Sequence, residues 1–507
     1  MKRTVVYLLT LALILSSIGV MAQTEYGEPI TFSLSSRNVN ANYDWSTDAL
    51  YKAITEKFNI DIDVWSVDAA TQDETGSVWI QGGSMPDAQM WAGFNYSTYM
   101  SYVEQDLIRA LPDGWETDYP NLHKMIQSTG LAEYIKVDGK TYGIPHAVFC
   151  NFAQMDRVVS HVSVYYRPDW LAKLEMAPWG ATTTPEQFIA YLKGSIENDL
   201  AGNGHTIGLT SNETRLLAYA MMFTGIDFDG FNATEQGYQW GPSMPGVTDT
   251  IAALREYYKE GLIDPDFYLI SDTDAMGVFY SGNAAALIYS GSASGVVQIV
   301  DAFRKANNVE DGYENVSMVT LTDSEEVAFA EETTNYWTMT LFNPKTEDAT
   351  MARILAMIDW LCTEEGQLIT QLGIQGIDWD YEADGELVSL TGKTAISTYP
   401  SFYPFNYMSI LSDDFSFVSP AFDSRVKQIV SDIYAAKQAG VVVPYDYDFA
   451  FHNSDAKKMY SVDITENAAK LVLNDADIES EWNAFINQYK MMVDPLLDEL
   501  NAQYPVK

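Results

Sequence analysis

Lys136-Val137-Asp138-Gly139-Lys140-Thr141-Tyr142-Gly143-Ile144-Pro145 is the first of two neighbouring stretches that decide the fold. Asp138-Gly139 is typical of a tight turn, because glycine tolerates positive φ and aspartate hydrogen-bonds to nearby backbone. Thr141 to Ile144 predicts a short strand. Pro145 ends that strand, because proline has no N–H to donate to a sheet.

The second stretch is Val164-Tyr165-Tyr166-Arg167-Pro168-Asp169-Trp170-Leu171. The run from Val162 to Tyr166 is β-branched and aromatic, which predicts a strand, and a helix is expected from Arg167 to Leu174. Thr184 is placed to cap the next helix, with Pro185 at its first position and Gln187 closing a capping box. The chain therefore finishes one strand, crosses, and begins a new strand–helix unit.

The amino-terminal region repeats the alternation of strand and helix. Ile30 to Leu34 predicts a strand, and a polar loop follows it. Ser46 or Thr47 is expected to cap a helix whose apolar residues recur at helical spacing through Phe58. Ile60 to Val64 predicts the next strand. Strands that alternate with helices are typical of an α/β protein with a mostly parallel sheet.

Composition excludes several classes of partner. The chain has 507 residues, is 47% hydrophobic and carries 12 Trp, 32 Tyr and 22 Phe, which indicates a folded protein of two or three domains. Its formal net charge is −41. A field of that sign repels nucleic acid and anionic lipid surfaces, so neither is expected as a partner.

Residues 1–22 predict a cleaved signal peptide. Lys2 and Arg3 precede an apolar run that is too short to anchor the chain in a bilayer, and the cut is expected after Ala22. No cysteine follows that position, so a lipid anchor is not expected. The mature protein is therefore predicted to be periplasmic or secreted.

The two stretches resemble the phrases "dGk.YgiP" and "yyRpDWL..L" of the extracellular solute-binding proteins of ABC importers, family 1, which includes maltose-binding protein. The phrase Tyr257-Tyr258-Lys259-Glu260-Gly261-Leu262-Ile263-Asp264-Pro265-Asp266-Phe267 is similar to the family's "lykEGLIDpdf". Matches reach across residues 80–490 and are weak in 385–450.

The resemblance implies a type II periplasmic-binding-protein fold, also called a Venus flytrap, with two α/β lobes. Lobe 1 is expected at 23–145 plus 335–378, and lobe 2 at 146–334 plus 379–507. It also implies a monomer that captures a small solute, an oligosaccharide above all, between the lobes and delivers it to a membrane permease. A peptide or another small solute is the alternative ligand.

A metal and a cofactor are not expected. Many relatives carry a calcium-binding loop where this chain has 199–208, but here Ala201 stands in place of an acidic ligand and the loop is shortened before His205. Calcium requires six or more oxygen ligands, and this loop offers too few.

The sequence contains no motif that indicates catalysis. The chain has no nucleophile elbow, zinc-protease helix or phosphate-binding loop, and its five histidines are scattered. A glycoside hydrolase is a third reading, because it needs only two suitably spaced carboxylates and the chain has 70 Asp and Glu.

Sugar recognition needs flat aromatic faces for the C–H surfaces of the ring and planar polar groups for its hydroxyls. Strand ends of α/β sheets are where such groups converge. By position the candidates are Trp91, Arg37, Trp337, Asn95, Trp45, Tyr289, Phe149 and Asn151, and after them Phe94, Ser292, Tyr336, Tyr403 and Phe405. Each aromatic has the alternative of a place in the core.

The two cysteines, Cys150 and Cys362, are expected to be free, because in the family layout they fall on different lobes that move relative to each other.

Overall fold

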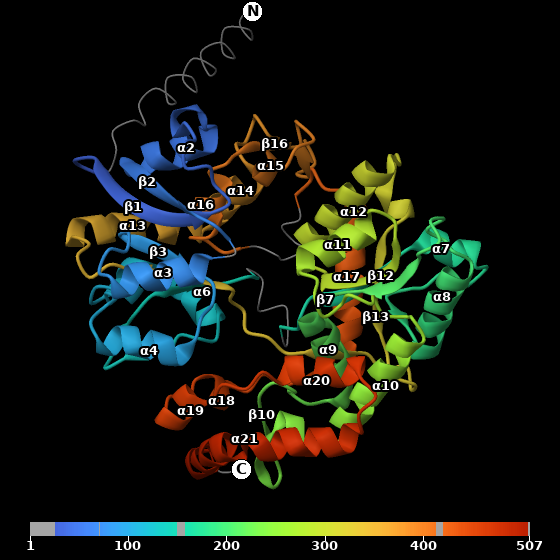
Figure 1. Ribbon diagram of the computed structural model, residues 1–507. Coiled ribbons are helices and arrows are strands. Elements are labelled where there is room, and N and C mark those ends of the chain that lie inside the picture. The colour runs from blue at the N-terminus through green and yellow to red at the C-terminus, as the bar shows by residue number, and fades with distance from the viewer. Residues whose placement is uncertain (1–25, 70, 150–157, 412–418, 505–507) are drawn as a thin grey trace, which may run out of the picture. The chain divides into compact units, whose positions relative to one another are not determined.

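The computed structural model describes residues 26–69, 71–149, 158–411 and 419–504 (Figure 1). The chain divides into two compact units, each assembled from separate segments. Unit 1 takes its described residues from Met1–Phe94, Ser101–Cys150 and Tyr336–Ser412. Unit 2 takes its own from Asn95–Met100, Asn151–Asn335 and Asp413–Lys507.

Unit 1 is built on a five-stranded sheet of order β2-β1-β3-β15-β6. β1 is parallel to β2 and to β3, whereas β15 is antiparallel to both of its neighbours. The carboxyl ends of the other four strands therefore meet at one edge, together with the amino end of β15. The strands are β1 (Ile30–Arg37), β2 (Ile60–Val67), β3 (Ala88–Trp91), β6 (Ile144–His146) and β15 (Thr338–Phe342).

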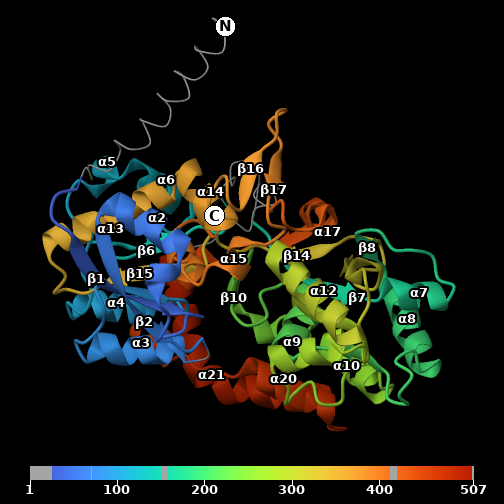
Figure 2. The ribbon, with the colours of Figure 1, turned by 90° about the horizontal axis from the view of Figure 1, so that it is seen from above.

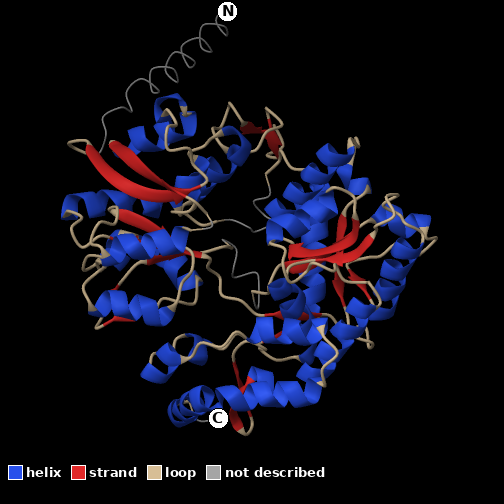
Figure 3. Cartoon of the chain, in the orientation of Figure 1, coloured by secondary structure: helices blue, strands red, loops and turns tan. Residues whose placement is uncertain are grey.

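Helices cover this sheet on both faces (Figure 3). They are α2 (Ala49–Phe58), α3 (Gln72–Gln81), α4 (Tyr96–Glu104), α5 (Trp115–Asp118), α6 (Pro120–Ser128), α13 (Asp348–Leu361), α14 (Glu364–Leu372), α15 (Ala395–Thr398) and α16 (Phe402–Asn406). Two hairpins, β4 (Lys136–Val137) with β5 (Lys140–Thr141) and β16 (Trp379–Tyr381) with β17 (Leu387–Ser389), complete the unit. The division between the units passes through α4.

Unit 2 repeats the plan with a sheet of order β8-β13-β7-β12-β9. Here β7 is antiparallel to its neighbours β12 and β13, whereas β12 is parallel to β9 and β13 to β8. The strands are β7 (Val162–Tyr166), β8 (Thr182–Thr183), β9 (Ile207–Thr210), β12 (Ala284–Ser290) and β13 (Ser317–Leu321). The carboxyl ends of β9, β12 and β13 thus share an edge with the amino end of β7.

The helices of unit 2 include some that lie beside this sheet and others that lie away from it (Figure 2). They are α7 (Pro168–Lys173), α8 (Pro185–Glu197), α9 (Glu213–Met221), α10 (Val247–Lys259), α11 (Asp272–Tyr280), α12 (Ala293–Asn307), α17 (Ser424–Ala439), α18 (Tyr447–Ala450), α19 (Asp455–Met459), α20 (Ile464–Leu473) and α21 (Ile478–Gln503). Short strand pairs join β10 (Phe231–Thr234) to β11 (Gly237–Trp240) and β14 (Phe329–Glu331) to β18 (Val441–Val443).

The two deciding stretches form most of the elements that the sequence predicts. The single strand expected over Thr141–Ile144 is wrong: β5 ends at Thr141 and β6 begins at Ile144, and Pro145 pairs with Met339 inside β6 rather than ending the strand. The Asp138-Gly139 turn joins β4 to β5, with both residues at positive φ. The strand predicted at Val162–Tyr166 is β7. Thr184 accepts a hydrogen bond from Gln187 N, and the Gln187 side chain completes the capping box of α8. The α/β composition of both units is therefore confirmed.

Two other local expectations are also wrong. The cap of α2 is Asp48, whose carboxylate accepts from Tyr51 N, rather than Ser46 or Thr47. The described residues 379–411 also belong to unit 1 and not to the second lobe. The physical reason is the same carboxylate, because Asp48 also accepts hydrogen bonds from the backbone N and the hydroxyl of Ser401.

Within the described residues no helix is long and apolar enough to cross a membrane. Cys362 is a free thiol whose Sγ lies 3.5 Å from Met125 Sδ, and burial raises its pKa. Cys150 lies outside the described residues, so the expectation about the pair stays a prediction.

Candidate functional site

The carboxyl edge of the unit 1 sheet carries a cluster of one arginine and three aromatic rings. Arg37 is the last residue of β1, and Trp337 comes immediately before β15. Tyr403 lies in α16, and Tyr407 follows that helix directly. Two separate segments of the sheet and a helix from the 379–411 region therefore bring these four side chains to one place. We call them the Arg37 cluster.

The Arg37 guanidinium holds the cluster together. Its central carbon lies 4.3 Å from the centroid of the Trp337 ring and 5.1 Å from that of Tyr407. Its Nε donates a hydrogen bond of 3.0 Å to the Tyr407 hydroxyl. The Trp337 and Tyr407 rings meet edge to face, with centroids 5.8 Å apart. These contacts fix the orientation of the indole, which is 41% exposed. An oriented, exposed ring is what a pyranose face can stack on.

Tyr403 extends the aromatic surface. Its ring centroid lies 6.0 Å from that of Tyr407. Burial, followed by the neighbouring Tyr407, raises the pKa of the Tyr403 hydroxyl, while Arg37 acts in the opposite direction. The phenol is therefore protonated at neutral pH, and its O–H is available as a hydrogen-bond donor.

Trp91 and Phe149 have places in the core of unit 1. Trp91 ends β3 and is 4% exposed, with its ring against Phe94 and Tyr102 at centroid distances of 5.5 and 5.9 Å. Phe149 is 2% exposed. Little of either ring is available to a ligand. Both aromatics therefore occupy the core position that the sequence analysis gave as their alternative.

Trp45 and Asn95 have local partners. Trp45 packs on Tyr51 of α2, with ring centroids 5.4 Å apart, and it is partly exposed. Asn95 is exposed and accepts a hydrogen bond from Thr98 N in the first turn of α4. Neither joins the Arg37 cluster through a described contact. Asn151 lies outside the described residues.

Unit 2 carries a second group of polar residues at the corresponding edge of its sheet. Tyr289, near the end of β12, stacks under the guanidinium of Arg215 at 4.9 Å. Arg215 in turn makes two hydrogen bonds of 2.7 Å to the carboxylate of Asp272. Asn212 caps α9 and donates to the same carboxylate. Tyr289 was predicted from the sequence, whereas Arg215, Asp272 and Asn212 were not.

A cavity of about 440 Å³, with a partly polar lining, adjoins this group. Its lining includes Asn212, Arg215, Asp272, Glu331 and Lys437. This volume fits a small ligand, and its donors and acceptors suit hydroxyl groups.

Two of the lining residues have strongly perturbed pKa values. Burial lowers the pKa of Lys437 to about 7, and the ammonium donates to the carbonyls of Ser160 and Val162. Burial also raises the pKa of Glu331 to about 7, with Asp227 and Asp229 adding to the effect. Such shifts occur at functional sites and also in structural ion networks.

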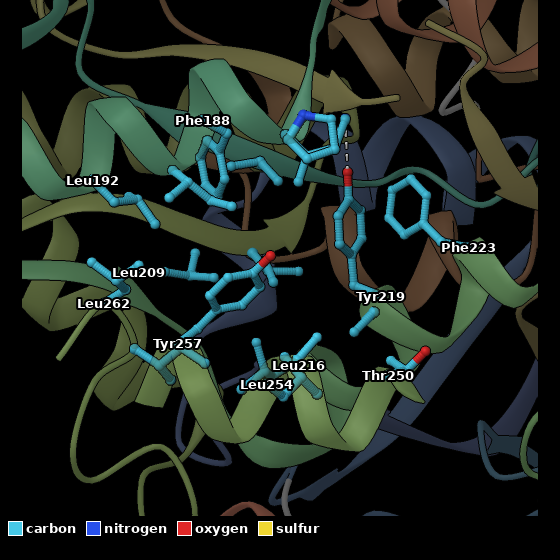
Figure 4. A pocket seen from close by; sticks show the side chains of 18 of the residues that line it. Phe188, Leu192, Leu209, Leu216, Tyr219, Phe223, Thr250, Leu254, Tyr257 and Leu262 are labelled. Carbon is cyan, nitrogen blue, oxygen red and sulfur yellow. Dashed lines mark hydrogen bonds between the residues drawn. The ribbon is translucent and has the colours of Figure 1, made fainter. Parts of the chain in front are cut away.

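A second cavity, of about 410 Å³, is almost entirely apolar (Figure 4). Helices α8, α9 and α10 line it with Phe188, Leu216, Leu254 and Tyr257 among others, and Leu209 belongs to the sheet beneath. The Tyr219 hydroxyl accepts from Leu321 N. The lining does not offer the converging polar groups that sugar hydroxyls require, so this cavity is not the candidate site.

Within the described residues no group of His, Cys, Asp and Glu side chains could hold a metal ion. In the 199–208 loop the Asp199 carboxylate accepts from Gly204 N and from the Thr206 hydroxyl, both at 2.8 Å. His146 is fully buried and hydrogen-bonded to Ser409 O and the Thr340 hydroxyl, and burial lowers its pKa to about 3. His146 is thus a core residue.

Comparisons with known proteins place this fold. No protein-family model matches the chain. The curated lipoprotein LipO of Bacillus subtilis (strain 168) is 23% identical over 285 residues, which are 54% of this chain. The chain spans only about half of that relative, 52% of its length.

Many solved structures match this chain, and the following two are among those that cover nearly all of it. The S. pneumoniae ABC-transporter substrate-binding protein FusA, in complex with kestose, has a TM-score of 0.67 and 15% identity, covering 94% of this chain and 98% of FusA. The alginate-binding protein AlgQ2 has a TM-score of 0.65 and 16% identity, with coverages of 94% and 98%. The chain therefore has the two-lobed α/β fold of the substrate-binding proteins of ABC transporters, as the resemblance in its sequence predicts.

Proposed function

We propose that this chain is the extracytoplasmic substrate-binding component of an ABC transporter and that its ligand is an oligosaccharide. The observation that carries the proposal is the Trp337 ring, which is exposed on one side and held by Arg37 and Tyr407. A rigid aromatic face beside planar hydrogen-bond donors is the combination that carbohydrate recognition requires.

Two of the matching structures support a sugar as the ligand, since one is a complex with kestose and the other is an alginate-binding protein. In unit 2, the sheet edge that carries Tyr289 and Arg215 offers further hydroxyl-binding groups, and we propose both residues as ligand-binding residues of that unit. The same proposal assigns a membrane permease as the partner, a monomeric state, and export directed by residues 1–22.

A peptide ligand is the second candidate, because arginine and aromatic side chains also bind peptides. A glycoside hydrolase is the third. The matching structures are of binding proteins, and we propose that this chain likewise binds its glycan without cleaving it. Incubation with a bound oligosaccharide, followed by mass analysis of the products, tests that statement; turnover would replace it with the hydrolase.

A thermal-shift screen of the mature protein tests the proposal. Panels of oligosaccharides, peptides and amino acids are added at equal concentration, and the midpoint of unfolding is followed. A ligand that binds only the folded state stabilises it by about 2.7 kcal/mol at one hundred times its Kd. Stabilisation by oligosaccharides alone is expected. Stabilisation by peptides alone would overturn the sugar assignment.

A further inference from the structure

We propose that the oligosaccharide carries an acidic group, a carboxylate or a sulfate, and that Arg37 binds it. This inference rests on the proposed function, because it names the class of sugar that the Arg37 cluster takes. The observations that carry it are the partners that Arg37 has and the partners that it lacks.

Arginines in the described part of this chain are generally paired with carboxylates. Five of them form ion pairs with an Asp: Arg109, Arg167, Arg215, Arg304 and Arg425. Arg255 and Arg353 instead donate to backbone carbonyls. Arg37 does neither. Among the described residues the one hydrogen bond of its guanidinium is from Nε to the Tyr407 hydroxyl.

The lack of a carboxylate partner is informative because this chain is rich in carboxylates. It has 70 Asp and Glu against 29 Lys and Arg. A half-buried guanidinium is costly to desolvate unless its donors find acceptors. Arg37 is partly buried between two rings, yet no described carboxylate forms an ion pair with it. An acceptor supplied by the ligand would complete its hydrogen bonding.

The geometry of the cluster suits an anion. The rings of Trp337 and Tyr407 occupy positions over the guanidinium, and Tyr407 also takes Nε. The two Nη atoms have no hydrogen-bond partner among the described residues. Their planar fork can donate two parallel hydrogen bonds to a carboxylate or a sulfate. A uronic acid stacked on Trp337 would present its carboxylate beside that ring.

The Arg215 group provides an internal contrast. Arg215 also lies over an aromatic ring, that of Tyr289, but two of its donors are already bonded to Asp272. Its charge is therefore balanced within unit 2. Of these two arginine–aromatic groups, the Arg37 cluster is the one whose guanidinium has no carboxylate partner among the described residues and can bind an external anion.

Calorimetric titration with matched sugars tests the inference. Trigalacturonate and sialyllactose are the acidic probes, and galactotriose and lactose are their neutral counterparts. Each is titrated into the full mature protein, into Arg37→Gln and into Arg37→Lys. Arg353→Gln is the control, because Arg353 also lacks a carboxylate partner but bonds to Phe58 O and Asn59 O, before the amino end of β2.

At least one acidic probe is expected to bind the native protein roughly 10- to 100-fold more tightly than its neutral counterpart, the range for charge-assisted hydrogen bonds. Arg37→Gln should remove that preference, Arg37→Lys should keep part of it, and Arg353→Gln should keep all of it. Equal binding of acidic and neutral sugars, or a preference that survives in Arg37→Gln, would overturn the inference and leave the proposed function standing. Failure of all sugars, together with binding of peptides, would overturn both.

Discussion

Replacing Trp337 by alanine separates a ligand-binding ring from a structural one. The indole is 41% exposed, so its removal empties no enclosed space in the core. Its main internal contact is the Arg37 guanidinium at 4.3 Å. A cation–π contact at an exposed site contributes about 0.5–1 kcal/mol, so we expect the free energy of unfolding to fall by no more than roughly 1–2 kcal/mol. Truncating a buried tryptophan would cost about 3–5 kcal/mol.

Trp337→Ala is expected to weaken oligosaccharide binding. Loss of an aromatic anchor at a binding site costs about 1–3 kcal/mol, which raises Kd by roughly 5- to 150-fold. Calorimetry with an oligosaccharide identified in the thermal-shift screen measures the affinity, and urea unfolding measures the stability. Trp337→Phe should restore part of the affinity, because phenylalanine keeps a smaller flat face.

Trp360→Ala is the matched control for this experiment. Trp360 is also a partly buried indole in unit 1 with a cation over its ring, since Lys57 Nζ lies 4.6 Å from the centroid. Trp360 lies near the end of α13 and packs on Phe58, the last residue of α2. The Trp360→Ala variant should be less stable than the wild type and should bind the oligosaccharide with unchanged affinity. Unchanged affinity in Trp337→Ala, or an equal loss in both variants, would refute the assignment of Trp337 to the site.

Three further predictions concern Trp91, Lys437 and the 199–208 loop. Trp91→Ala should cost about 3–5 kcal/mol of stability with little change in affinity, because Trp91 is buried; unfolding curves close to those of the wild type would return it to the ligand-binding set. Burial lowers the pKa of Lys437 from 10.5 to about 7, so between those values the unfolded chain holds a proton that the folded chain has released, and stability should rise with pH by up to about 1.4 kcal/mol per unit. The increase in the free energy of unfolding between pH 7 and pH 10, measured with urea, should be smaller in Lys437→Met than in the wild type. An equal increase in the two proteins would contradict the prediction. Calcium titrated into chelator-treated protein should give no saturable heat at the 199–208 loop, where Asp199 is bonded to Gly204 and Thr206; a stoichiometric site abolished by Asp199→Asn would show the reverse.

The sequence predicted best what short-range chemistry determines. The strand at Val162–Tyr166 follows from β-branched and aromatic residues in a row, and the start of α8 follows from a capping box within four residues. The unit that contains 379–411 depends instead on hydrogen bonds between Ser401 and Asp48, which are far apart in the chain. No local pattern carries that information.

The sequence predicted only part of the candidate site, because some of its residues are brought together by long-range contacts. Arg37 and Trp337 were selected by their places beside strands, and Tyr403 was named as an aromatic in the region 385–450, where the family matches are weak; the structure brings the three together. Tyr407 was missed. A signal for it exists, because it stands four residues after Tyr403 and side chains at that spacing lie on one face of a helix. Arg215 had no comparable signal, since its pairing with Tyr289 and Asp272 is long-range.

The register of the unit 1 sheet explains why Trp337 and not Trp91 presents a ring. Leu34 of β1 pairs with Ala88 of β3, so Arg37 and Trp91 stand at the same level, three residues further along. Met339 of β15 pairs with Trp91, which puts Trp337 two residues beyond that level. β3 lies between β1 and β15 in the sheet and ends at Trp91. The Arg37 guanidinium lies over the indole of Trp337 beyond the end of β3. Trp91 stands two residues deeper in the sheet than Trp337, and its ring packs on Phe94 and Tyr102. Exposure at a strand end is therefore set by how far each neighbouring strand extends, a property of the register that a motif for one strand does not contain.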